Sequence, residues 1–80
     1  MKIFGYEAGG GDGAEIRPAA LDEITLQASP AELRKIAAFL NACADGIETR
    51  GKDWEHEHLS DRVKEFEGSP HFVVFNPEAV

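Results

Sequence analysis

A short segment in the second half of the chain gathers most of the residue types that could do chemistry. It runs from residue 53 to residue 61, and its candidate residues combine two imidazoles, four carboxylates and one indole: Asp53, Trp54, Glu55, His56, Glu57, His58 and Asp61. Side chains alternate between the two faces of an extended chain, so an extended segment would place Trp54, His56 and His58 on one face. Such a row suits metal ligation, a pH-sensitive contact or recognition of a basic partner.

Metal binding and acid–base catalysis are the two chemical uses of the histidines. His56 and His58 could ligate a divalent metal together, but their spacing differs from helical metalloprotease motifs and no cysteine ligands accompany them. Histidine–carboxylate pairs also act as general acids and bases. Ser60 is near in the sequence, yet no nucleophile elbow surrounds it. The sequence therefore predicts no catalytic residue and no cofactor. A metal-dependent or acid–base enzyme using His56 and His58 remains the alternative.

The third use, recognition of another protein, agrees with the composition. The 80 residues carry 15 Asp and Glu against 8 Lys and Arg, which gives a formal net charge of −7. Nucleic acids are bound by clusters of Lys and Arg, so nucleic acid is not a predicted partner. An acidic surface favours a basic protein, because complementary charges speed encounter. We therefore predict that the seven residues of the segment contact a basic protein partner.

The length and the single cysteine limit the architecture. Eighty residues are enough for one domain with one modest core, so residues 1–80 are predicted to be a single domain. One cysteine, Cys43, cannot form an internal disulfide, and we interpret it as a small core residue. No apolar run approaches the roughly 20 residues that a membrane span needs, and no signal-peptide pattern follows Met1. A cytoplasmic protein without a membrane partner is the expectation.

The N-terminal part of the sequence predicts two strands joined by a flexible loop. Residues 2–7 contain Ile3, Phe4 and Tyr6 and indicate a short strand. Residues 8–20 contain a cluster of glycines, which predicts a flexible turn rather than a phosphate-binding loop, because no helix begins directly after it. Residues 21–28 place Ile24 and Leu26 on one face, which indicates a strand with one buried face.

The strongest local signal is the start of a helix at residue 30. Ser29 supplies an N-cap, Pro30 occupies the first helical position and Glu32 completes a capping box. Apolar residues then recur at helical spacing and form the predicted core stripe: Leu33, Ile36, Ala37, Leu40, Ala44 and Ile47, widened by Phe39 and Cys43. The helix is expected to end at Gly46, or at Gly51 if one further turn is added.

The remaining elements complete an α+β domain. Ser60 is expected to cap a short helical turn in which Val63 and Phe66 point inward, and the apolar run at residues 71–75 predicts an interior strand. These elements predict a small two-layer domain: a largely antiparallel sheet of three to four strands with one main helix on one face. Because one helix covers only one face, the other face is wet, covered by loops or buried in a homodimer.

The order of these motifs resembles the immunity protein 32 family of bacterial polymorphic toxin systems. The resemblance rests on the strand and helix start at residues 24–33, on Glu55-His56-Glu57-His58-Leu59 and on His71-Phe72-Val73-Val74-Phe75-Asn76-Pro77. It implies a single-domain cytoplasmic antidote that binds and neutralises a cognate toxin, without catalysis or a cofactor. Many toxins of such systems are nucleases with basic clefts, so the resemblance also implies a basic toxin as partner. It transfers no individual binding residue.

Overall fold

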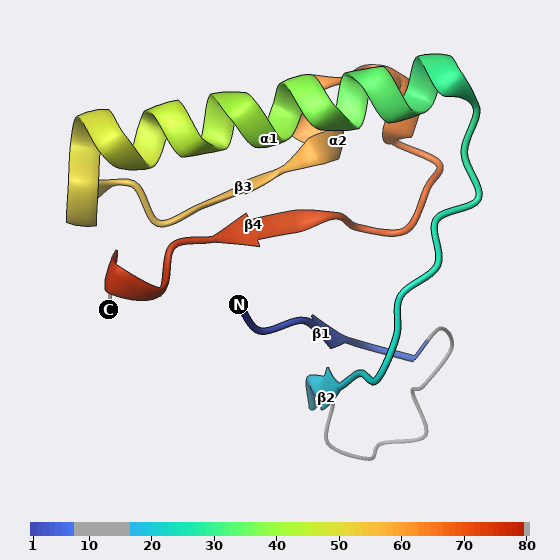
Figure 1. The fold of residues 1–80 in the computed structure, drawn as a ribbon, viewed down its shortest axis with the longest axis horizontal. Coiled ribbons are helices and arrows are strands. Elements are labelled where there is room, and N and C mark those ends of the chain that lie inside the picture. The colour runs from blue at the N-terminus through green and yellow to red at the C-terminus, as the bar shows by residue number, and fades with distance from the viewer. Residues whose placement is uncertain (8–16, 80) are drawn as a thin grey trace.

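The computed structural model describes residues 1–7 and 17–79 (Figure 1). Residues 1–7 and 17–28 form an N-terminal segment, and the helix-and-strand body follows from residue 29 to residue 79. In the body, the long helix α1 (Pro30–Arg50) lies over an antiparallel pair of strands, β3 (His56–His58) and β4 (Val73–Phe75). In the N-terminal segment, β1 (Phe4–Gly5) pairs with β2 (Ala19–Ala20) in a separate two-stranded sheet. The predicted α+β class is confirmed, but the predicted single sheet of three to four strands is replaced by two sheets of two strands.

Short helical elements connect the strands of the body. They are η1 (Gly51–Asp53), α2 (Leu59–Arg62), η2 (Lys64–Phe66) and η3 (Pro77–Ala79). The predicted cap at Ser60 is wrong, because the N-cap position of α2 is His58, two residues earlier, and no side-chain cap hydrogen bond forms there. The inward orientation of Val63 and Phe66 is confirmed, since Phe66 is 7% exposed and Val63 packs against the core.

Helix α1 begins as the capping box predicts. The Ser29 side-chain oxygen accepts a hydrogen bond from the Glu32 N–H at 3.1 Å, and the Glu32 carboxylate accepts one from the Ser29 N–H at 2.8 Å. Hydrogen bonding of the Glu32 carboxylate to the Ser29 backbone, and then to the Ser29 side chain, lowers the pKa of the Glu32 carboxyl. The longer of the two predicted ends is correct: Gly51, at φ 56°, caps the helix and donates its N–H to the Ile47 carbonyl.

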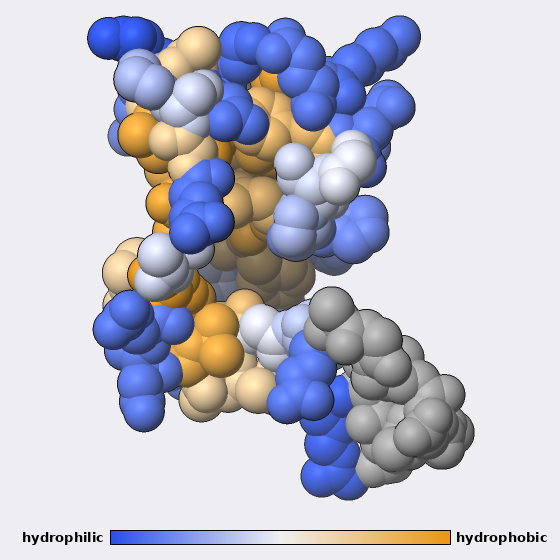
Figure 2. All heavy atoms as spheres, turned by 90° about the vertical axis from the view of Figure 1, so that its right-hand side faces the viewer, coloured by the Kyte–Doolittle hydropathy of each residue, from blue (hydrophilic) through white to orange (hydrophobic). Residues whose placement is uncertain are grey.

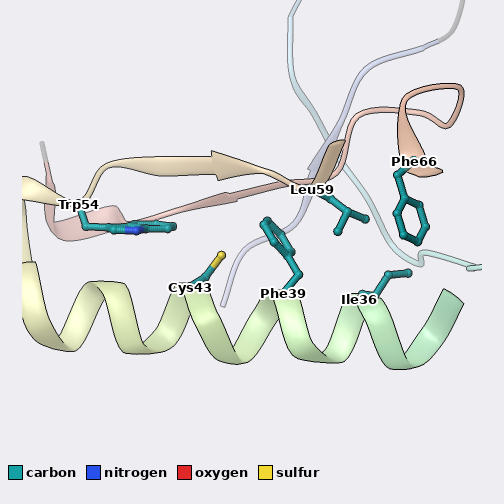
Figure 3. Close-up of a cluster of buried hydrophobic side chains, with 6 residues drawn as sticks. All are labelled: Ile36, Phe39, Cys43, Trp54, Leu59 and Phe66. Carbon is teal, nitrogen blue, oxygen red and sulfur yellow. The ribbon is translucent and has the colours of Figure 1, made fainter. Parts of the chain in front are cut away.

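The core is a single layer between α1 and the elements that follow it (Figure 3). Its buried side chains are Ile36, Phe39, Cys43, Trp54, Leu59 and Phe66. Phe39 also meets Phe72 edge to face, with ring centroids 6.3 Å apart. The predicted core stripe is therefore only partly correct, because Leu33 and Leu40 are 45% and 44% exposed. Two strands are narrower than the apolar arc of the helix, so one edge of that arc has no strand beneath it.

The register of β3 and β4 decides which side chains face the helix. Glu57 lies opposite Val74, while His56 and His58 lie opposite Phe75 and Val73. Val74 packs against the core, and side chains of directly opposed residues share a face. Glu57 therefore points toward α1, and the two histidines point to the outer face. The prediction that residues 71–75 form an interior strand is wrong, since β4 pairs with β3 alone among the described strands.

The N-terminal segment is separate from this core. None of the residues in it that the structure describes belongs to the core cluster, and Ile24 and Leu26 are 50% and 48% exposed. The predicted strand at residues 21–28 is wrong, because this stretch has no strand pairing. Of the predicted loop at residues 8–20, residues 8–16 lie outside the described part, and Ala19–Ala20 form β2. Figure 2 shows a recess between the two parts with apolar atoms along it.

Candidate partner-binding surface

The acidic segment, residues 53–61, crosses three elements on one side of the body. It begins at the end of η1, continues through β3 and ends in α2. Asp53, Glu55, His56 and Asp61 are exposed, whereas His58 and Glu57 are half-buried. Trp54 is 6% exposed. The structure therefore divides the seven predicted residues into a group that solvent reaches and a smaller group that holds the segment against the body.

Trp54 belongs to the second group, which corrects the expected row of Trp54, His56 and His58. Regular alternation starts only at His56, and the indole turns inward and packs on Gly46 of α1. A β-carbon at Gly46 would lie 2.5 Å from the indole nitrogen of Trp54 and 2.7 Å from the neighbouring ring carbon. Gly46 is the shorter of the two predicted ends of the helix. Instead the helix continues through it, and the missing side chain makes room for the indole.

Asn76 fixes the start of the segment from the other side. Its side-chain nitrogen donates to the carbonyls of Gly51 and Trp54 at 3.1 and 3.0 Å, and its side-chain oxygen accepts the Glu78 N–H at 3.1 Å. Asn76 is 2% exposed, so these bonds satisfy an amide that would otherwise be buried without partners. Sequence reasoning missed this role. The feature of the sequence that could have indicated it is the position of Asn76, directly after an apolar strand and before Pro77.

Glu57 forms an ion pair with Arg62 of α2. Its carboxylate accepts a hydrogen bond from the Arg62 side chain at 2.8 Å. The buried thiol of Cys43 lies near this pair: burial raises the pKa of Cys43 most strongly, and the Glu57 carboxylate raises it further, while Arg62 lowers it. A thiol with a raised pKa is a poor nucleophile at neutral pH, which fits the interpretation of Cys43 as a core residue.

The outer face of the β3–β4 pair carries a row of imidazoles. The rings of His56 and His58 meet edge to face with centroids 5.4 Å apart, and the rings of His58 and His71 meet in the same way at 5.7 Å. Glu55 lies 2.9 Å from the Nδ1 atom of His56, and Asp61 lies 4.0 Å from Nδ1 of His58. His71 joins this row because it lies two residues before Val73, on the same face of the chain.

The metal hypothesis finds no ligand set in this arrangement. Across residues 1–7 and 17–79, no group of three or more His, Cys, Asp or Glu side chains has the geometry to hold a metal ion. The row of His56, His58 and His71 and its neighbouring carboxylates therefore does not converge on a single metal position. His56 and His58 are each paired with a carboxylate of their own, at Glu55 and Asp61.

The exposed carboxylates give the surface its electrostatic character. Within the described part of the chain, Asp53, Glu55 and Asp61 form no ion pair with lysine or arginine. In the body, Lys35 pairs with Glu65 and Arg62 pairs with Glu57. Arg50 donates a hydrogen bond to the backbone carbonyl of Asp53 at 3.2 Å, and the acidic segment presents three exposed carboxylates that form no ion pair with a lysine or arginine of the described chain.

Comparison with known protein families identifies a family for this chain. The sequence model of the family described as Immunity protein 32 matches residues 23–77, which is more than half of the chain. The chain belongs to the immunity protein 32 family. The match covers α1 and the whole acidic segment, and it leaves out β1 and β2. No curated protein and no solved structure matches the chain.

Membrane insertion finds no support in the described part of the fold. Nowhere in residues 1–7 and 17–79 does a helix combine the length and the apolar character that crossing a bilayer requires.

Proposed function

We propose that this chain is a non-catalytic, cytoplasmic binding protein that neutralises a cognate bacterial toxin through the acidic segment 53–61. Membership of the immunity protein 32 family supports the antidote role. The observation that carries the choice of surface is the set of three exposed carboxylates, Asp53, Glu55 and Asp61, which form no ion pair with a lysine or arginine of the described chain.

The direct contacts in this proposal are Asp53, Glu55, His56, His58 and Asp61. Trp54 and Glu57 do not contact the partner directly but hold the segment in place. The indole is buried on α1, and the Glu57 carboxylate is paired with Arg62. This arrangement fixes the backbone of the segment before a partner arrives. A surface that is already ordered loses less conformational entropy on binding, which favours affinity.

The partner that fits this surface is a basic protein. The chain carries a net charge of −7, so its field attracts a cationic partner over a distance of about one Debye length, roughly 8–10 Å at physiological salt. Charges at the rim of an interface act mainly on the association rate. We therefore expect rapid association with the toxin at low salt and slower association as salt is added.

The test begins with capture of the toxin by tagged full-length chain from a lysate of the source cell, with identification by mass spectrometry. Association kinetics of the isolated pair are then compared for the wild type and the double variant Asp53→Lys, Glu55→Lys. Reversing two exposed charges should slow association by about tenfold or more at low salt, and by less at moderate salt.

The matched control reverses two exposed charges elsewhere on the body, at Glu48 and Glu67. The control variant Glu48→Lys, Glu67→Lys changes the net charge by the same amount, so it separates a local effect from a general one. A loss confined to the first variant supports the acidic segment. Equal association rates for the two variants would place the interface elsewhere on the protein.

A further inference from the structure

Helix α1 carries a second apolar stripe that no part of the described chain covers. The stripe is formed by residues at helical spacing, all of them exposed: Leu33, Ala37, Leu40 and Ala44. It is about 16 Å long at 1.5 Å per residue. Two leucines exposed by nearly half their surface in one row are more than the isolated apolar residues that any protein surface shows.

The stripe lies on the flank of α1 that faces away from α2. The opposite flank, with Lys35, Ala38 and Ala42, forms a shallow groove together with Arg62 and Val63 of the α2 region. Gly46, which receives Trp54 just before β3, lies near that groove flank on the helical wheel. Since β3 and α2 occupy the groove side, the stripe lies on the β4 side, and in Figure 1 α2 is seen partly behind α1.

Strand β4 has a free edge on that same side. The Glu55–Asn76 and Leu59–Phe72 pairs at the ends of the ladder are joined by backbone hydrogen bonds at 2.8 and 2.9 Å. In an antiparallel ladder the residues between bonded positions direct their N–H and C=O groups outward. Val73 and Phe75 are such residues, and no described strand pairs with them on the outer side. Their side chains are 44% and 52% exposed.

The geometry points to a homodimer in which the α1 stripe and the β4 edge of one chain dock on the same elements of a second copy. A two-fold axis perpendicular to the sheet makes both the helices and the edge strands antiparallel, as antiparallel ladder pairing requires. The two sheets then join into one four-stranded sheet that carries both helices on one face. Phe39 packs on Phe72, so an axis through the middle of the stripe passes near Phe72. The outward backbone groups of Val73 then pair with those of His71 in the second copy.

The side-chain sizes of the stripe are complementary to themselves under that axis. Leu33 lies as far before the midpoint of the stripe as Ala44 lies after it, and the same holds for Ala37 and Leu40. In an antiparallel helix pair, each leucine of one chain therefore meets an alanine of the other. Alternation of large and small residues across facing positions lets helices interdigitate closely.

The charges beside the stripe are also complementary. Arg34 and Asp45 border it on the solvent side and are exposed. Around the same axis, Arg34 of one chain comes within about one helical turn of Asp45 of the other. The net charge of −7 on each chain opposes association at long range, so added salt should strengthen this dimer. That dependence is the reverse of the one expected for toxin binding.

The test is sedimentation equilibrium of the full-length protein over a wide concentration range. The wild type should rise from its monomer mass of 8.7 kDa toward twice that value, at lower concentration when salt is added. Leu40→Glu and Leu40→Lys each place like charges near the axis and should remain monomeric. An equal mixture of these two variants should form a heterodimer, because the opposite charges then meet. Circular dichroism is used to check that both variants fold.

The control is Leu26→Glu, which introduces the same charge at an exposed leucine outside the stripe and should dimerise as the wild type does. A wild type that keeps its monomer mass at all concentrations would overturn the inference. So would Leu40 variants that self-associate like the wild type, because the contact would then lie elsewhere. Neither result bears on the acidic segment, so the proposed toxin binding is tested independently.

Discussion

The helix-and-strand body and the N-terminal segment contain apolar residues in similarly regular patterns, but only the body buries them. In the body, α1 places Phe39 and Cys43 at 4% and 2% exposure. In the N-terminal segment, Ile24 and Leu26 alternate regularly and are about half exposed. The difference lies in what each pattern needs. A helix satisfies its backbone within itself, whereas a strand needs a neighbouring strand to supply its hydrogen bonds.

The comparison also explains where the acidic segment is placed. The body supplies three fixed points for it: the cavity left by Gly46 for Trp54, the amide of Asn76 and the ion pair between Arg62 and Glu57. In the described N-terminal segment, β1 pairs with β2 and Leu21 packs on Gly5, but none of its residues belongs to the core cluster. A binding surface is therefore expected on the body, where side chains are held by packing, and each prediction below tests that division.

The largest effect is expected from removing a core ring in the body. Phe39→Ala leaves a cavity beneath Phe72 and should lower the free energy of unfolding by about 3–5 kcal/mol. The matched change in the N-terminal segment, Leu26→Ala, should lower it by less than about 0.5 kcal/mol, because Leu26 packs on no core residue. Urea unfolding measures both. A loss at Leu26 comparable to that at Phe39 would remove the distinction between the two parts.

A smaller effect is expected where the body has no space to spare. Gly46→Ala improves helix propensity but drives a methyl group into the Trp54 ring, so it should destabilise the protein by about 1–3 kcal/mol. Gly68→Ala is the control, since a β-carbon there meets nothing within 4 Å. Thermal unfolding and tryptophan fluorescence together report the loss and the displaced indole. If both variants are as stable as the wild type, Trp54 does not pack on Gly46 of α1 as described.

The smallest effect is expected at the junction between the two parts. Ser29→Ala removes the cap of α1 and should lower the free energy of unfolding by about 0.5–2 kcal/mol at neutral pH. The pKa of Glu32 is lowered in the folded state, so its contribution is present above its unfolded pKa and is lost as the pH falls through the folded value.

The difference in stability between the wild type and Ser29→Ala should therefore shrink below about pH 4. Urea unfolding over a pH series checks this, and Ser69→Ala serves as a serine outside the helix cap. A difference that stays constant down to the lowest pH would show that the Glu32 carboxylate takes no part in the cap.

Local signals were enough to predict the frame of the body. The capping box at Ser29 and Glu32 requires only residues within one turn, and it marks the start of α1 correctly. The α+β class and the membership of the immunity protein 32 family also follow from the order of the motifs. These features depend on neighbours in the sequence or on the pattern as a whole.

Features that depend on distant partners could not be predicted. The exposure of Leu33 and Leu40 depends on the width of the sheet beneath α1, which periodicity does not reveal. The inward turn of Trp54 depends on the space at Gly46, eight residues earlier. Glycine near the end of a helical pattern commonly marks its end, so the packing role of Gly46 was hidden by a more frequent one.

The most direct test of the division between body and N-terminal segment is amide hydrogen exchange on the full-length protein. The amides of α1, β3 and β4 should exchange slowly because they are hydrogen-bonded within a packed unit. The amides of residues 23–28 should exchange about as fast as those of an unstructured peptide, since no strand pairs with them. Protection of residues 23–28 equal to that of β4 would contradict the account and show that this stretch is a strand of the body.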